Sequence, residues 1–384
     1  MLTASAMTTV GALPVFLLTA QVAFVSADLH FGAARLGLAA SIFFAAAAVS
    51  SFGTGVLAER LGGRISTVAS ATLSVVSCLG IAFFASSYGQ LVAWVIVGGV
   101  ANAALQTTSN LSLAHSIPAS SQGLAFGMKQ SAIPAAILIG GLAVPTVGHE
   151  LGWRAPFMIA AFLAVITAGV GLRLTPARSS ASTARPAARE APPTGALILT
   201  TVTMALASSA VNSLGAFLPA WCHENGWEPG RAGLLVAAAS ATSIAGRVLA
   251  GIAADRRRGR NLPVVSVHLI AGAVGIALIS TGAPAPLIVG AFLAFGLGWS
   301  WPGLLLFAVV RVARDSPGRA SGAIQTGAFI GGAVGPLTFG LLVEARGYDT
   351  AWWAAVVGLI VAASLLFLAR RIFVTDLIRR PMTH

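Results

Sequence analysis

Long apolar stretches alternate with short polar breaks along the whole chain. Each stretch holds about 20 mostly apolar residues, the length that a helix needs to cross the hydrocarbon core of a bilayer. The pattern predicts spans over 4–27, 36–57, 65–86, 90–114, 119–146 and 154–174 and, after a polar break, over 196–221, 232–254, 262–282, 285–310, 319–343 and 351–370. We therefore expect an all-α polytopic membrane protein with 12 transmembrane helices.

The polar break in the middle divides these helices into two groups of six. Residues 174–195 read LTPARSSASTARPAAREAPPTG and are rich in Ser, Pro, Ala and Arg, a composition typical of a solvent-exposed linker. We expect an N-terminal six-helix bundle over 1–174 and a cytoplasmic linker over 175–195. A C-terminal six-helix bundle over 196–384 is expected to end in a short cytoplasmic tail.

Composition and charge agree with a membrane protein. The 384 residues are 57% hydrophobic and 9% charged, whereas soluble domains carry roughly 25% charged residues. Seventeen arginines fall in the loops after helices 2, 6, 8 and 10 and in the tail, while the opposite side has four: Arg35, Arg154, Arg231 and Arg346. Because cytoplasmic loops are enriched in arginine, both termini are expected to be cytoplasmic, in the plasma (inner) membrane of a prokaryote. The net charge of +12 then reflects topology, and no nucleic-acid partner is expected.

Two loops in the two halves share a sequence pattern. Residues 55–64 read GVLAERLGGR and residues 251–260 read GIAADRRRGR, at an offset of 196. The same offset aligns three further pairs: Arg35 with Arg231, Gly37 with Gly233, and Asp28 with Glu224. A shared register of this kind indicates a parallel internal duplication, so the two bundles are expected to be pseudo-symmetric.

Both loops resemble the G-x-L-A-[DE]-R-x-G-[RK] loop of the major facilitator superfamily. The first copy matches it at Gly55, Leu57, Glu59, Arg60, Gly62 and Arg64, and the second at Gly251, Asp255, Arg256 and Arg260, while Ala253 and Arg258 depart from it. The resemblance implies two bundles that rock about a central cavity, with these loops as cytoplasmic latches. It assigns gating roles to Glu59, Arg60, Arg64, Asp255, Arg256 and Arg260. In the alternative interpretation, the arginines only enforce topology.

Two basic residues fall well inside predicted spans, away from the span ends. Lys129, the only lysine, lies in the stretch GLAFGMKQSAIP of helix 5, and Arg247 lies in helix 8, eight residues before Asp255. Charges within spans are costly and usually functional. One cation from each half at similar depth is the arrangement expected for an anion held between the bundles. Two alternatives are that Lys129 snorkels toward the cytoplasm and that Arg247 donates to backbone carbonyls.

Uncharged polar residues near this depth complete the candidate binding site. Ser243 shares a helical face with Arg247, and Asn102 and Gln106 belong to a polar stripe on helix 4. Gln130 and Gln325 occupy similar places in the two halves, and Asn212 and Trp299 are further candidates for the wall. Interhelical hydrogen bonding and packing are the alternatives for these residues. The scattered histidines and cysteines predict no metal site, and no catalytic residue or nucleotide-binding loop is recognisable.

The stretch GRVLAG at 246–251 resembles the helix 8 arginine region of monocarboxylate and oxalate/formate-type porters. This likeness implies that Arg247 binds a substrate carboxylate. Monocarboxylate porters place an aspartate one turn earlier, where this chain has Ser243. No Asp or Glu lies in the middle of any predicted span, unlike in the drug/proton and sugar/proton members of the superfamily.

These features predict a secondary active transporter, and not an enzyme, that moves a small organic anion, a carboxylate in particular, by alternating access. The protein is expected to act as a monomer in the lipid bilayer without a cofactor. A proton is one candidate coupling ion, and symport and antiport both stay open. The alternative function is an exporter of amphipathic or neutral compounds in which the two intramembrane cations are structural.

Overall fold

The computed structural model describes residues 2–114, 122–174, 194–257, 261–312 and 317–379, and nearly all of them are helical. The first half contains α1 (Leu2–Ala20), α2 (Val22–Leu29), α3 (Ala33–Phe84), α4 (Tyr88–Ala114), α5 (Gln122–Gln130), α6 (Ala132–Ala143), the π-helix η2 (Val144–Gly148), α7 (His149–Leu151) and α8 (Ala155–Leu174). The second half contains α9 (Thr194–Glu224), α10 (Pro229–Arg256), α11 (Asn261–Ser280), α12 (Pro284–Leu293), the π-helix η3 (Ala294–Gly298), α13 (Pro302–Val312) and α14 (Pro317–Arg379).

The helices account for the expected number of membrane crossings. Eleven segments of the described chain are long and apolar enough to cross a bilayer. The last of them, Gly322–Asp376, has 55 residues, or roughly 80 Å of helix at 1.5 Å per residue. It turns at Gly347, whose φ of 82° interrupts the helix, so it supplies two crossings. The prediction of 12 transmembrane helices is confirmed.

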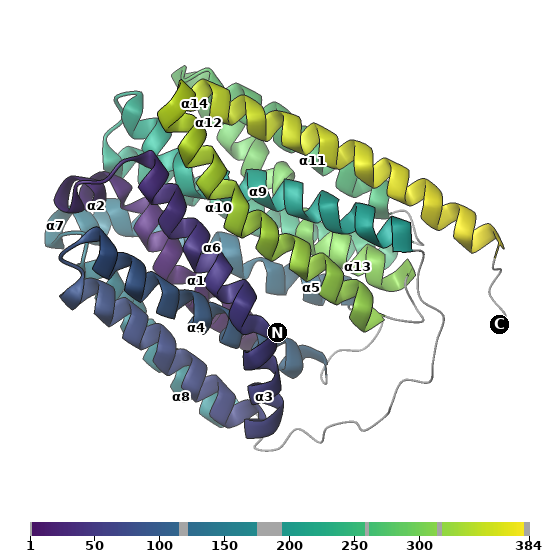
Figure 1. Ribbon diagram of the computed structural model, residues 1–384, viewed down its shortest axis with the longest axis horizontal. Helices are drawn as coiled ribbons and strands as arrows, with labels where there is room; N and C mark the ends of the chain where they lie inside the picture. The colour runs from purple at the N-terminus through teal and green to yellow at the C-terminus, as the bar shows by residue number, and fades with distance from the viewer. Residues whose placement is uncertain (1, 115–121, 175–193, 258–260, 313–316, 380–384) are drawn as a thin grey trace.

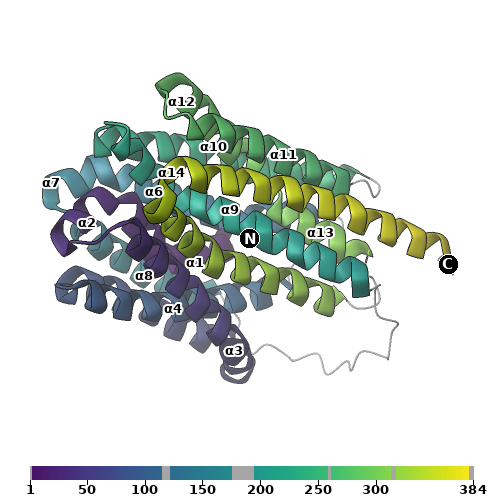
Figure 2. The same cartoon turned by 45° about the horizontal axis from the view of Figure 1, so that its top comes forward.

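The two halves form two helical bundles that lie side by side (Figure 1). In both views α3 and the first part of α14 lie close together at one end of the molecule and diverge toward the other (Figures 1 and 2). Large apolar side chains such as Phe162, Val289 and Val357 are exposed on the outside, as expected for surfaces that face lipid. The predicted linker at 175–195 falls almost entirely outside the described residues, so the bundle boundaries stay predictions.

Glycines set how closely the bundles approach each other. Gly37 of α3 lies against the backbone of Pro336 in α14, and Gly233 of α10 lies against the carbonyl of Gly141 in α6. A Cβ atom would not fit at either glycine without a shift of the neighbouring backbone, and small residues are what allow such close contact. Since position 233 aligns with 37 and position 141 with 336, to within one residue of the 196-residue offset, these contacts are pseudo-symmetric.

Three predicted spans are broken rather than continuous. The first breaks at Gln21, the fifth at Ser131 and again in η2, and the tenth in η3 and at Trp299. The predicted spans gave no sign of these breaks, because hydropathy reports the length of a span and not its backbone geometry. Prolines supply part of the cause. Pro134 and Pro302 lack an N–H and cannot donate to the carbonyl four residues earlier.

Candidate functional site

Arg247 lies near the middle of α10, and its side chain is only 2% exposed. Its Nε donates a hydrogen bond to the carbonyl of Trp299 at 3.0 Å, and its Nη1 donates to the carbonyl of Gln130. Trp299 belongs to the second bundle and Gln130 to the first. The guanidinium therefore joins the two bundles through backbone atoms.

Both carbonyls lie at breaks in a helix. The Gln130 carbonyl lacks its usual helical donor because the residue four positions later is Pro134. Trp299 has a non-helical backbone (φ −111°, ψ 14°) between η3 and α13. The sequence KQSAIP thus leaves an acceptor inside the membrane, and Arg247 satisfies it. These bonds are of the kind given in the alternative interpretation of Arg247, a donor to backbone carbonyls, and the spacing of Gln130 and Pro134 was a usable signal for one of the two acceptors.

The third guanidinium nitrogen, Nη2, takes no part in these two hydrogen bonds. Nη2 of Arg247 is buried and has no hydrogen-bond partner within the described residues, and the same holds for the hydroxyls of Ser240 and Ser243. These three residues share one face of α10, and the guanidinium carbon lies 5.7 Å from the centroid of the Trp299 ring. Buried polar groups without partners are rare and costly. An acceptor bound here would satisfy several donors at once.

Lys129 lies in the last turn of α5, next to Gln130, and is 7% exposed. In α5 the contacts with α10 are made by Gly123 and Gly127, and Lys129 lies about half a turn beyond Gly127, on another face of the helix. At Gly127 a Cβ atom would approach the Arg247 carbonyl oxygen to 2.5 Å, which shows how tightly the two helices pack. The expectation that the two cations hold one anion between the bundles stays a prediction. At the 196-residue offset the repeat counterparts of Lys129 and Arg247 are Gln325 and Ser51, so neither charge is repeated in the other half.

The remaining predicted binding residues are spread over other helices. Asn102 is fully buried on α4 beside Gly11 of α1, and its Oδ1 accepts a 3.5 Å hydrogen bond from Gln106. Asn212 donates to the Ser208 carbonyl of its own helix at 2.8 Å.

Trp299 is buried, with its ring against Gly215 of α9, whereas Gln325 is half-buried on α14. Within the described chain, no hydrogen bond connects Asn102, Gln106, Asn212 or Gln325 to Arg247. The structure brings Gln130 and Trp299 to Arg247, with Ser243 on the same face of α10, and the binding roles of all the predicted site residues, Lys129 included, stay predictions.

Asp255, near the end of α10, contacts the other bundle. Its two carboxylate oxygens accept hydrogen bonds from the backbone N–H groups of Gly123 and Leu124 at 2.8 and 2.9 Å. These N–H groups belong to the first turn of α5, where they have no partner within the helix, and the helix dipole favours a negative charge there. This contact closes the α5–α10 interface at the arginine-rich end.

The other predicted gating residues make no such bridge in the described chain. Arg60 and Arg256 are exposed, and Arg64 donates from Nε to the Leu172 carbonyl of its own bundle at 2.6 Å. The side chain of Glu59 and all of Arg260 lie outside the described residues. At this end α3 and α14 diverge, and a Cβ atom placed on Gly55 or Gly322 would meet nothing within 4 Å.

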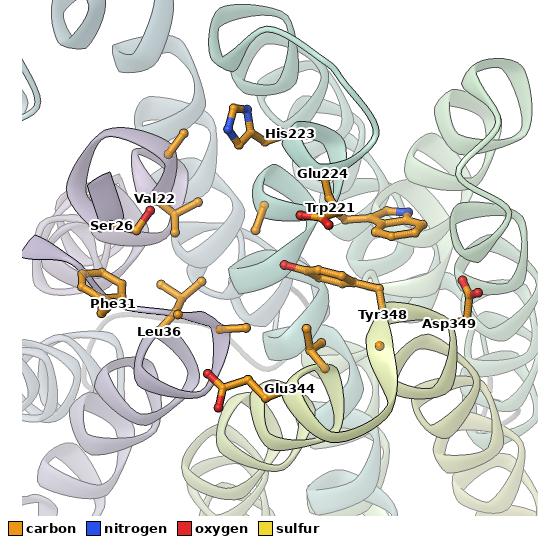
Figure 3. A pocket seen from close by; sticks show the side chains of 16 residues that line it. Val22, Ser26, Phe31, Leu36, Trp221, His223, Glu224, Glu344, Tyr348 and Asp349 are labelled. Atoms are coloured by element: carbon orange, nitrogen blue, oxygen red, sulfur yellow. The ribbon is translucent and has the colours of Figure 1, made fainter. Parts of the chain in front are cut away.

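A cavity of about 540 Å³ lies between the bundles at the opposite end (Figure 3). Ser26 and Phe31 line it from the first half, and Trp221, Glu224, Glu344, Tyr348 and Asp349 line it from the second. Glu344 accepts a 2.8 Å hydrogen bond from the backbone N–H of Ala34, in the first turn of α3. No sequence motif marks this cavity, because its residues come from three separate loops and helix ends.

Comparison with known families agrees with this architecture. The family model described as Major Facilitator Superfamily matches residues 2–336, and it also matches residues 197–379. The chain belongs to the major facilitator superfamily. The second match covers the C-terminal bundle, as expected for an internal duplication. The protein is therefore an integral membrane transporter of this superfamily, a family of transport proteins rather than enzymes.

Two curated relatives in the superfamily are similar over most of the chain. An uncharacterized MFS-type transporter of Mycobacterium tuberculosis is 27% identical over 342 residues, which cover 82% of this chain and 72% of the relative. A chloramphenicol resistance protein of Streptomyces lividans is 27% identical over 361 residues, which cover 91% of this chain and 90% of the relative. Neither name refers to an organic anion.

Proposed function

We propose that this superfamily member is a secondary active transporter of a small organic anion, a carboxylate in particular. The observation that carries the proposal is the state of Arg247. Its guanidinium is buried between the bundles and donates hydrogen bonds to two backbone carbonyls. The third nitrogen, Nη2, has no partner among the described residues. A carboxylate matches that nitrogen in charge and hydrogen-bonding geometry.

The positions of the acidic residues support a bound ligand, rather than a carboxylate of the protein, as the partner for the charge of Arg247. All 11 carboxylates of the sequence lie in loops or near the ends of spans: Asp28, Glu59, Glu150, Glu190, Glu224, Glu228, Asp255, Asp315, Glu344, Asp349 and Asp376. Removing a charge from water costs several kcal/mol unless a partner compensates it. A bound anion would supply this compensation for Arg247, with Lys129 close by on α5.

The same geometry suggests how binding is coupled to movement. Because Arg247 bonds to Gln130 in one bundle and to Trp299 in the other, separation of the bundles here must break at least one of these bonds. A bound anion competes for the same donors and offers a replacement partner. Binding would thus lower the cost of the rocking movement, which is the requirement for alternating access.

A second candidate is export of neutral or amphipathic compounds, with the cations structural. The two carbonyl bonds of Arg247 favour it, since a structural arginine would make such contacts. The name of the Streptomyces relative, a chloramphenicol resistance protein, also favours it. In this case Arg247 would stabilise the broken helices and would not contact the substrate.

A counterflow screen of small carboxylates and of chloramphenicol in proteoliposomes tests the proposal. We expect at least one carboxylate to drive counterflow, with a loss of about tenfold or more in Arg247→Lys, because lysine cannot reproduce the bidentate geometry. Arg346→Lys, at an exposed position of the opposite end, is the matched control. Counterflow by chloramphenicol alone, unchanged in Arg247→Lys, would favour the second candidate.

A further inference from the structure

The cavity at the α2–α9 end carries a charge opposite to that of the buried cations. It has a volume of about 540 Å³, within the range of ligand pockets. Three carboxylates line it, those of Glu224, Glu344 and Asp349, together with His223 but no lysine or arginine. In Figure 3, Glu224 lies above the Tyr348 ring and Glu344 lies below it. Carboxylates exposed to water are ionised at neutral pH, so the cavity is electronegative.

None of the four arginines of this end lines the cavity. Arg154 is paired with Asp28 at 2.9 Å and Arg231 with Glu228 at 3.5 Å, while Arg35 lies over the Tyr88 ring at 5.4 Å and keeps its charge. The fourth, Arg346, is exposed and does not line the cavity. Glu224 and Asp349 form no hydrogen bond or ion pair with any described residue. Their charges therefore act on whatever enters the cavity.

We propose that Glu224, Glu344 and Asp349 make this cavity an electrostatic filter that disfavours anions and favours cations at the outer mouth of the transporter. Placing the cavity outside follows from the arginine-rich loops at the other end, which are expected to be cytoplasmic. A charge-lined cleft changes the local concentration of an ion according to its sign. Glu224, Glu344 and Asp349 would then weaken the affinity for an anion that arrives from outside.

The expected size of the effect follows from screened Coulomb interaction. For three charges about 8 Å away in water at physiological salt, the local concentration changes by about threefold, upward for a cation and downward for an anion. The ratio of a cation to an anion of similar size should then shift by about sevenfold. Such a shift is large enough to measure and should disappear at high salt.

Labelling a cysteine in the cavity with reagents of opposite charge tests the filter without knowledge of the substrate. Ser26 lines the cavity and is half-buried, and the native Cys78 and Cys222 are buried. Cationic and anionic methanethiosulfonates are applied to intact cells expressing Ser26→Cys, and the rate ratio is normalised to that of a thiol in solution. We expect the cationic reagent to be favoured by about sevenfold at physiological salt and by less than twofold at 1 M salt.

Neutralising the cavity should reduce this preference by about threefold in the double variant Glu224→Gln with Asp349→Asn. Glu344 is left in place because it contacts Ala34. Glu228→Gln removes one carboxylate that does not line the cavity and should leave the ratio unchanged. The proposal is overturned by a normalised ratio near one, by a ratio that the double variant does not change, or by a cysteine that does not react from outside.

The consequence for transport rests on the proposed function and has its own measurement. For a carboxylate that drives counterflow, the double variant should lower the half-saturating external concentration about twofold and leave the cytoplasmic value unchanged. A flat labelling ratio together with carboxylate transport would refute the filter alone. A charge-dependent ratio without transport of any carboxylate would refute the proposed function alone.

Discussion

Arg247 of the second bundle donates a hydrogen bond to the backbone carbonyl of Gln130 in the first, at the point where Pro134 removes the normal helical donor. This contact explains why a broken helix and a buried arginine occur together. Lys129 directly precedes Gln130 in the sequence, one residue from this contact. The stretch that contains the only lysine is thus half of a polar junction between the bundles.

The first prediction concerns the stability of this junction. Arg247→Gln removes the guanidinium from two buried carbonyls and should destabilise the protein by about 1–3 kcal/mol. Adding Pro134→Ala supplies an N–H to the Gln130 carbonyl and should recover about 1 kcal/mol, as a coupling in a double-mutant cycle. Thermal unfolding in detergent measures both effects. Pro219→Ala, a proline inside α9, is the control and should show no coupling to Arg247→Gln.

The second prediction concerns the gate at the arginine-rich end. Asp255→Asn cannot accept both the Gly123 and the Leu124 N–H groups as a charged carboxylate does, so the α5–α10 interface should open more often. A cysteine at Phe126, half-buried on α5, should then react faster with a water-soluble maleimide in inside-out vesicles. Glu150→Gln, exposed at the opposite end, should leave the rate unchanged. Equal rates in Asp255→Asn and wild type would contradict a gating role.

The gating role predicted for Glu59 has the same test. Glu59→Gln should raise the reactivity of a cysteine placed in the cytoplasmic vestibule if the first loop copy acts like the second. A rise with Asp255→Asn alone would mean that only the C-terminal loop is a latch. This asymmetric outcome would agree with the divergence of α3 and α14 at this end (Figure 2).

The third prediction concerns topology. The distribution of arginines places the linker at 175–195 and both termini in the cytoplasm. A cysteine at Ser180 should be labelled by an impermeant maleimide only after the cells are permeabilised. The Ser26→Cys variant is the control for access from outside, because Ser26 lies at the other end of the molecule. Labelling at Ser180 in intact cells would reverse the orientation.

The fourth prediction separates the roles of the two cations. An arginine stays charged throughout a transport cycle, whereas a lysine in an apolar site can exchange its proton. Lys129→Arg should retain anion binding but flatten the pH dependence of uptake, and Lys129→Gln should weaken binding at least tenfold. Uptake assays across pH 5.5–8.5 measure both (a range of about three pH units around the neutral region). If Lys129→Gln kept the uptake and pH dependence of the wild type, the predicted role in anion binding would be contradicted, and the alternative that Lys129 snorkels toward the cytoplasm would be favoured.

The sequence predicted the fold well because its signals act over long stretches. Spans of about 20 apolar residues, the break before Thr194 and the 196-residue repeat are each averaged over many positions, so single departures do not obscure them. The breaks at Ser131 and Trp299 depend on single backbone groups. Hydropathy contains no information about such groups.

The candidate site was only partly predictable for a related reason. The cost of a buried charge marks Lys129 and Arg247 from sequence alone. Which atoms they contact depends on how the helices pack, and Gly127 and Gly251 set that spacing through contacts between the bundles. The polar stripe of Asn102 and Gln106 looked equivalent in the sequence, yet it lies on α4 beside α1, and no hydrogen bond joins it to the arginine in the described part of the chain.

The most direct test of the central claim compares a transported carboxylate with its uncharged amide analogue in wild-type protein and in Arg247→Gln. If Nη2 of Arg247 binds the carboxylate, wild type should bind the acid about 100-fold or more tightly than the amide, since charged hydrogen bonds at a buried site are worth a few kcal/mol. Arg247→Gln should lose most of this preference while still binding the amide. Binding is measured calorimetrically on the full-length protein in nanodiscs. Equal discrimination between acid and amide in the two proteins would contradict the assignment of Arg247 as the anion partner.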